Sequence, residues 1–206
     1  IRDQPRSRGL GDVYKRQGPD PSAHRIVGLY MMTVNGQLMF IADATINIYP
    51  DARTLAEIAL QTARVARRFG VTPKVAMLSF SNFGTSNELR TDRIEEAITM
   101  AREMDRGLVI DGPMQADTAL VPDRQKEFPF MEFEGPANVL VCPNLASANI
   151  AYKLLQRIAG AEMTGPILEG LAKPAHVLQR GDSVRQVVHM AAITAVDAQR
   201  HARQRL

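Results

Sequence analysis

The chain has 206 residues, of which 45% are hydrophobic and 23% charged, and its formal net charge is +3. This composition is typical of a soluble globular protein that is long enough for one large or two small domains. The excess positive charge lies within residues 1–17, so the basic balance does not indicate nucleic acid as a partner. No run approaches the ~18 apolar residues of a membrane span. A single cysteine, Cys142, and no signal peptide favour the cytoplasm.

Residues 1–17 show no apolar periodicity and resemble a translated adapter sequence. We therefore treat this segment as a non-native or disordered tail and exclude it from the fold prediction. A genuine basic arm is the alternative. The native sequence is expected to begin near Gly18.

The next segment predicts a β-hairpin followed by a helix. Residues 26–34 and 38–42 are mostly apolar and are interpreted as two strands joined at Asn35-Gly36, a strong hairpin turn signal. Asp51 and Thr54 are candidate caps for a helix over residues 54–69, which Gly70 would end.

Strands and helices alternate through the rest of the first 160 residues. Short apolar runs predict buried strands at 75–78, 108–110 and 137–142, and helical spacing predicts helices over 88–104, 114–120 and 146–159. This alternation is typical of an α/β sandwich with a mostly parallel sheet and right-handed crossovers.

Polar side chains crowd the loop after the strand at 75–78. The residues concerned are Ser79, Ser81, Asn82, Gly84, Thr85 and Ser86. Ligands of open α/β sheets bind at the carboxyl ends of strands, and a glycine-containing loop that leads into a helix suits an anion. The alternative is an ordinary strand-to-helix turn.

After Gly160 the composition changes. Residues 164–181 are rich in glycine and proline and suggest a crossing into a neighbouring domain, and an amphipathic helix follows from Ser183. Asp111 and Asp117 could form a carboxylate pair, although holding loops is the simpler interpretation. The four histidines have no ligand-like spacing, and Cys142 is interpreted as a core residue.

Six collinear segments resemble the phosphate acetyltransferase/butyryltransferase family. They are Val75-Ala-Met-Leu-Ser-Phe-Ser81, residues 111–120, Gly135-Pro-Ala-Asn-Val-Leu-Val141, residues 149–156, Gly165-Pro-Ile-Leu168 and Gly170-Leu-Ala-Lys-Pro174. Within the family the chain is most similar to the C-terminal domain of bacterial NADP-dependent malic enzymes. Three features carry this similarity: Ser81-Asn-Phe-Gly84 replaces Ser-Thr-Lys-Gly, Phe128-Pro-Phe130 precedes Gly135, and His176-Val-Leu-Gln-Arg-Gly181 replaces Asn-Asp-Leu-Ser-Arg-Gly.

The resemblance implies a three-layer α/β fold of the phosphotransacetylase kind, with a two-domain architecture similar to isocitrate and isopropylmalate dehydrogenases. Residues 18–160 would form one domain. Residues 161–206 would form the return segment and C-terminal helix of a second domain whose N-terminal part is missing. Such a fragment is expected to expose an apolar face.

The resemblance also bears on the chemistry. Acyl transfer from an acyl phosphate to coenzyme A needs a base for the thiol, a donor for the oxyanion and a cationic clamp on the phosphate. Arg180 is retained, whereas Gln179 replaces the family's serine and residues 184–186 supply no carboxylate. The resemblance therefore implies an acyl-CoA-binding domain with lost or weakened chemistry, with no catalytic residue and no metal ligand assigned. Candidate ligand residues are Ser79, Ser81, Asn82, Gly84, Thr85, Ser86, Asn149, Lys173 and Arg180. Arg180 could instead be a solvated cation beside a turn, and Asn149 could bond only locally.

Three functions remain open. The first is a regulatory domain of an NADP-dependent malic enzyme that binds acetyl-CoA or a related acyl-CoA and supports a homo-oligomer. In that case this chain binds no cofactor, and NADP with Mg or Mn belongs to a missing upstream module that oxidises malate to pyruvate. The second is an active phosphate acetyltransferase or butyryltransferase. The third is an oligomerisation module that binds nothing.

Overall fold

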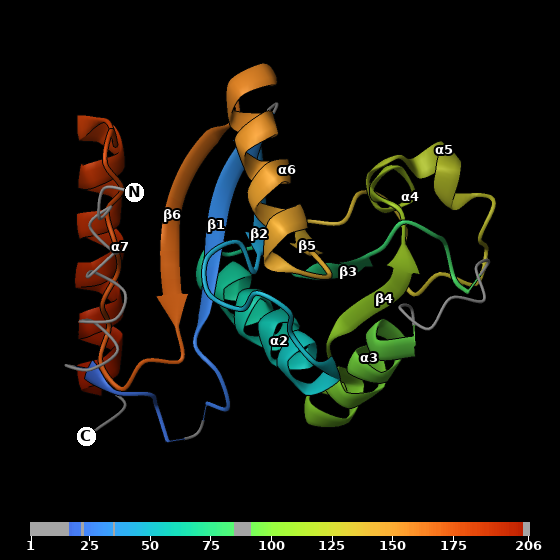
Figure 1. Cartoon of the computed structure of the whole chain (residues 1–206), viewed down its shortest axis with the longest axis horizontal. Coiled ribbons are helices and arrows are strands. Elements are labelled where there is room, and N and C mark those ends of the chain that lie inside the picture. The colour runs from blue at the N-terminus through green and yellow to red at the C-terminus, as the bar shows by residue number, and fades with distance from the viewer. Residues whose placement is uncertain (1–16, 22, 35, 85–91, 204–206) are drawn as a thin grey trace, which may run out of the picture.

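The computed structural model describes residues 17–21, 23–34, 36–84 and 92–203. These residues form a six-stranded sheet in the order β4-β3-β5-β2-β1-β6 with helices packed against it (Figure 1). The strands are β1 (Val27–Val34), β2 (Gln37–Ala42), β3 (Lys74–Leu78), β4 (Val109–Met114), β5 (Val139–Val141) and β6 (Glu162–Glu169). The helices are α2 (Ala52–Arg68), α3 (Asp92–Met104), α4 (Ala116–Leu120), α5 (Pro122–Gln125), α6 (Leu145–Ile158) and α7 (Val184–Arg203).

The sheet is mixed. Strands β2, β5, β3 and β4 are parallel neighbours, whereas β1 runs antiparallel to both β2 and β6. The predicted hairpin of β1 and β2 is confirmed, and it is also the reason why the expectation of a mostly parallel sheet is not confirmed. The chain reverses between Val34 and Gln37, so β1 opposes β2, and the edge strand β6 pairs with β1 in the antiparallel direction as well.

Successive residues of a strand face opposite sides of the sheet, which gives the molecule two apolar cores. Phe40 lies in the core shared with α2, α3 and α7, whereas the next residue, Ile41, lies in the core shared with α4 and α6. Helices therefore cover both faces. The predicted three-layer α/β arrangement follows from this alternation.

Helix α2 spans Ala52–Arg68, close to the predicted range of 54–69, and the predicted cap and end residue are both present. The Asp51 side chain accepts a hydrogen bond from the backbone N–H of Thr54 at 2.8 Å, which caps the N-terminus. Past the other end, Gly70 has φ 76°, a left-handed conformation that favours glycine. Leu55, Ile58 and other apolar residues of one face are buried against the sheet.

The segment after Gly160 differs from its prediction. Residues 162–169 form β6, an edge strand paired with β1, rather than an irregular crossing. Pro166 fits there because an edge strand does not need every N–H group for pairing. Gly165 fits because a Cβ at this position would lie 2.8 Å from the Tyr30 ring. Met190 and Ile193 of α7 then pack into the core beside β6. The assignment of residues 161–206 to a second domain stays a prediction.

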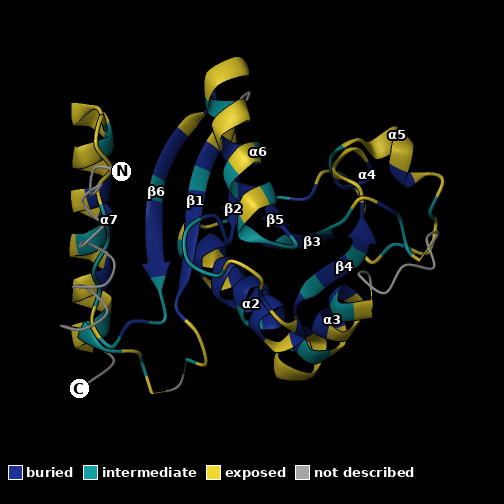
Figure 2. Cartoon of the chain, viewed as in Figure 1, coloured by how far each residue is buried: buried dark blue, intermediate teal, exposed yellow. Residues whose placement is uncertain are grey.

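Helix α6 exposes an apolar stripe. Ile150, Leu154 and Ile158 are spaced four residues apart and are 60%, 51% and 81% exposed. Figure 2 shows exposed residues along the outer side of this helix. An exposed apolar face was expected. Within the described part of the chain, no helix combines the length and apolar character required to cross a membrane.

Candidate functional site

The sheet places a crevice at the carboxyl ends of β3 and β5. The chain leaves β3 through α3 towards β4 on one side, and it leaves β5 through α6 towards β6 on the other side. Adjacent parallel strands whose connections diverge in this way leave an opening between their following loops, the usual ligand position in α/β sheets. A cavity of about 920 Å³ lies there. Its lining includes Tyr49, Leu78, Ser79, Phe80, Arg93, Ile94, Cys142, Pro143, Asn144, Ala146 and Ser147.

The loop after β3 is fastened to the start of α4. The backbone N–H of Gln115 donates to Oδ1 of Asn82 at 2.7 Å, and the Gln115 side chain donates to the carbonyl of Phe80 at 2.7 Å. Phe83 donates its N–H to the Pro113 carbonyl at 2.7 Å. Asn82 therefore holds the loop in place.

The structure brings only part of the predicted loop site into the crevice. Ser79 lines it, whereas Ser81, Asn82 and Gly84 are absent from its wall. Ser81 is buried, and among the residues that the structure describes its Oγ has no hydrogen-bond partner. Gly84 has φ 75°. Thr85 and Ser86 lie outside the described residues.

The three other predicted ligand residues lie away from the crevice wall. Asn149 is half-buried, and its amide donates to the Ala44 carbonyl at 3.4 Å. Lys173 and Arg180 are exposed on the segment between β6 and α7. Their role in ligand binding stays a prediction.

Arg93 is the crevice residue that the sequence analysis missed. It lies in the first turn of α3, and its Nη2 donates to the Pro143 carbonyl at 3.0 Å across the opening. Its Nε is buried and has no hydrogen-bond partner in the ranges described above. The sequence signal was a cation shortly after the Ser/Gly loop. That signal does not by itself identify Arg93 as a crevice residue, because only the fold brings Pro143 opposite Arg93.

The N-terminus of α6 forms the opposite wall. Asn144 caps the helix by accepting from the backbone N–H of Ser147 at 2.9 Å. The positive end of a helix dipole thus borders the cavity. Burial raises the pKa of the neighbouring Cys142 thiol to about 12, so this side chain stays a thiol at neutral pH and is unsuited to nucleophilic attack.

Asp111 and Asp117 hold loops. Asp111 accepts from the N–H groups of Gly112 and Glu132, each at 2.9 Å, and Asp117 accepts from the N–H of Thr118 at 2.9 Å. Across the described ranges, no group of three histidine, cysteine or carboxylate residues is placed to hold a metal ion.

The fold and the crevice together define an α/β protein with a cleft where its strand connections diverge. The family described as phosphate acetyl/butaryl transferase matches residues 7–195, and the chain belongs to this family. The match begins within residues 1–17, the segment excluded from the fold prediction.

Two kinds of curated relative are similar to the chain. It is 41% identical to the phosphate acetyltransferase of Bacillus subtilis over 83% of its own length and 53% of that protein. It is 46% identical to the NADP-dependent malic enzyme of Escherichia coli over 78% of its length and 21% of that enzyme. The chain thus spans about half of such a phosphate acetyltransferase and about a fifth of the malic enzyme.

A solved structure extends the likeness to the fold. The phosphotransacetylase of Streptococcus pyogenes superposes with a TM-score of 0.89 at 36% identity. The superposition covers 94% of this chain and 60% of that protein.

Proposed function

We propose that the chain is the cleft-bearing part of a phosphate acyltransferase, which transfers an acyl group between an acyl phosphate and coenzyme A. Of the functions considered from the sequence, this was the alternative to a malic-enzyme regulatory domain. The relatives support it, because matches to phosphate acetyltransferases cover more of this chain and of the relative. The observation that carries the proposal is the crevice at the ends of β3 and β5.

The crevice chemistry suits the proposed acyl phosphate. Its phosphate would lie between Arg93 and the N-terminus of α6, because a guanidinium and a helix N-terminus both attract anions. Leu78, Phe80 and Ile94 would surround a short acyl chain. In the reaction, the coenzyme A sulfur forms a bond to the carbonyl carbon while the carbon–oxygen bond to phosphate breaks, and the thiol proton leaves with the departing phosphate.

The test is an acyl-transfer assay on the full-length protein with acetyl phosphate and coenzyme A, read as thioester formation. Arg93→Gln removes the cation from the crevice, and we expect KM for acetyl phosphate to rise by about tenfold, the effect of one lost charged hydrogen bond. Arg106→Gln is the matched control, because Arg106 is exposed just beyond the same helix and does not line the crevice. Equal kinetics for the two variants would remove Arg93 from the site, and no rate for the parent protein would remove the transferase proposal.

The regulatory function remains the second candidate because of Gln179. Its amide donates to the Tyr30 hydroxyl, and its backbone N–H donates to Asp182 at 2.7 Å. Gln179 therefore makes a structural contact at the position where, by the resemblance given above, active members of the family carry a serine. If this candidate is right, the parent protein forms no acetyl-CoA, acetyl-CoA inhibits its malate oxidation, and Arg180→Ala weakens that inhibition.

A further inference from the structure

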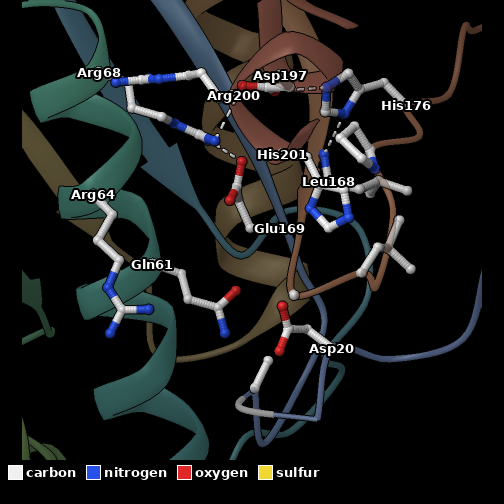
Figure 3. Close-up of a pocket in the computed structure, with 14 residues that line it drawn as sticks. Asp20, Gln61, Arg64, Arg68, Leu168, Glu169, His176, Asp197, Arg200 and His201 are labelled. Carbon is white, nitrogen blue, oxygen red and sulfur yellow. Dashed lines mark hydrogen bonds and ion pairs between the residues drawn. The ribbon is translucent and has the colours of Figure 1, made fainter. Parts of the chain in front are cut away.

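A second cavity, of about 470 Å³, lies at the carboxyl end of β6 (Figure 3). It is enclosed by α2, α7 and the chain segments that flank β6 and β1, and it shares no lining residue with the crevice. Its polar lining consists of Asp20, Gln61, Arg64, Arg68, Glu169, His176, Asp197, Arg200 and His201.

One side of this cavity is a closed network of charges. Arg68 of α2 pairs with Glu169 of β6 and with Asp197 of α7, the latter at 3.1 Å. His176 accepts the backbone N–H of Leu168 at its Nδ1, so its Nε2 carries the proton and donates to Asp197 at 3.1 Å. Both carboxylates are therefore already matched to protein donors.

Three buried polar atoms on residues that line this cavity have no hydrogen-bond partner within the described part of the chain. They are Oε1 of Gln61, Nε of Arg68 and Nε2 of His201. They make up half of the six unpartnered buried side-chain atoms found in the described ranges. Each such atom costs about 1–3 kcal/mol if it stays unmatched. All three belong to residues that line this one cavity, which makes it a candidate site for a polar occupant.

The Gln61 amide has a defined orientation. Its Nε2 donates to the Arg25 carbonyl at 2.9 Å and to Glu57 at 3.3 Å, so Oε1 is left as the acceptor. Gly170 keeps the space beside Oε1 open, because a Cβ at position 170 would lie 3.3 Å from that oxygen. An occupant must therefore supply a hydrogen-bond donor to Gln61.

Two of the remaining groups, Arg64 and Arg200, are cations, and Asp20 is the remaining carboxylate of the lining. Arg64 and Arg200 line the cavity, and no ion pair joins either of them to a carboxylate among residues 17–21, 23–34, 36–84 and 92–203. The unpartnered Nε of Arg68 adds a third donor from a cation. Guanidinium groups bind planar and tetrahedral oxyanions well.

We propose that this cavity binds a small oxyanion that also carries a hydrogen-bond donor, of which hydrogen phosphate is the simplest example. The arginines bind its oxygens, and its hydroxyl group donates to Gln61. The site does not depend on the proposed acyl transfer, because it uses other residues on other elements.

Calorimetric titration of the full-length protein tests the proposal. Inorganic phosphate retains a proton near neutral pH, whereas sulfate is a tetrahedral anion without one. We expect phosphate to bind about tenfold more tightly than sulfate at equal ionic strength, the effect of one added hydrogen bond. If the natural occupant is a phosphomonoester, glycerol 3-phosphate binds more tightly still, because its hydroxyl groups donate. Equal affinity for phosphate and sulfate, or no binding of either phosphate compound, would overturn the proposal.

Variants assign the binding to this cavity. Arg200→Gln should weaken phosphate binding about tenfold, whereas Arg203→Gln, the same change on an exposed residue of the same helix, should not. Gln61→Leu should abolish the preference for phosphate over sulfate. Binding that Arg93→Gln removes and Arg200→Gln leaves intact belongs to the crevice, and this result would also overturn the proposal. The transferase assay is a separate readout, so either proposal can fail alone.

Discussion

Gly112 lies on β4 where its backbone passes closest to β3. Its φ is 137°, and a Cβ there would lie 2.6 Å from the Met77 carbonyl oxygen and 3.1 Å from the Met77 Cβ. Because both contacts involve atoms at or next to the backbone, a side chain at this position would force the two strands apart. The position therefore requires glycine for two reasons, backbone conformation and space.

We expect Gly112→Ala to lower the free energy of unfolding by about 3 kcal/mol, combining backbone strain with overpacking. Gly160→Ala is the control. Gly160 also has a positive φ, of 64°, but a Cβ there would meet nothing within 4 Å, so the expected loss is only about 1 kcal/mol. Urea denaturation of both variants measures the difference, and equal losses would show that the close approach of β4 to β3 does not matter.

The structure shows where the predicted ligand residues lie but does not test their binding. Ser79 lines the crevice, Asn82 fastens the loop, and Arg93 was not among the predicted residues. A short motif shows which polar groups are available near a strand end. It does not show which of them are used by neighbouring backbone, because residues such as Gln115 arrive from elsewhere in the chain.

At the scale of elements, the cap of α2 is a clear case of local determination. The Asp51 carboxylate accepts from Thr54, and these hydrogen bonds hold the pKa of Asp51 below its usual value. The charged form is thus favoured by folding. Its stabilising effect is present above the unfolded-state pKa and is lost as the pH falls through the folded-state pKa.

Asp51→Ala should therefore lower the free energy of unfolding by about 1 kcal/mol at neutral pH, with a smaller loss in acid. Asp51→Asn should retain most of the stability at neutral pH, because an asparagine amide oxygen also caps a helix. Urea denaturation at several pH values measures both. A loss for Asp51→Ala that does not change with pH would contradict the role given to the charge.

Elements with local signals were predicted well. The hairpin of β1 and β2 and the helices α2 and α6 follow from turn residues, caps and apolar spacing, all within a few residues of one another. Strand β6 was missed because its glycine and proline are poor strand formers. They are accepted only because the strand lies at the sheet edge, beside Tyr30 of β1.

At the scale of the molecule, a single charged network joins three elements that are distant in sequence. Arg68 of α2 contacts Glu169 of β6 and Asp197 of α7, and His176 contacts Asp197 as well. Burial by itself raises the pKa of Asp197. Its hydrogen bond from His176 and the charge of Arg68 outweigh this effect, so the pKa lies below the usual value.

We expect Asp197→Asn to lower the free energy of unfolding by about 1–3 kcal/mol, less than for a fully buried pair because Arg68 is partly solvated and keeps Glu169. Glu162→Gln breaks the exposed pair with Arg185 at the other end of α7 and should cost less than about 0.5 kcal/mol. Thermal or urea denaturation compares the two. If they cost the same, the network does not hold α7 to the rest of the molecule.

The sequence by itself determined the α/β class, the hairpin of β1 and β2, the Asp51 cap of α2 and the strand end beside which the crevice lies. These depend on periodicity and turn chemistry, which act between near neighbours. Only the tertiary structure decided that the sheet is mixed, that Arg93 faces Pro143 across the crevice, and that Gln61, Arg68 and His201 converge on a second cavity. Those arrangements depend on contacts between segments far apart in the chain, and no local pattern encodes which segments will meet.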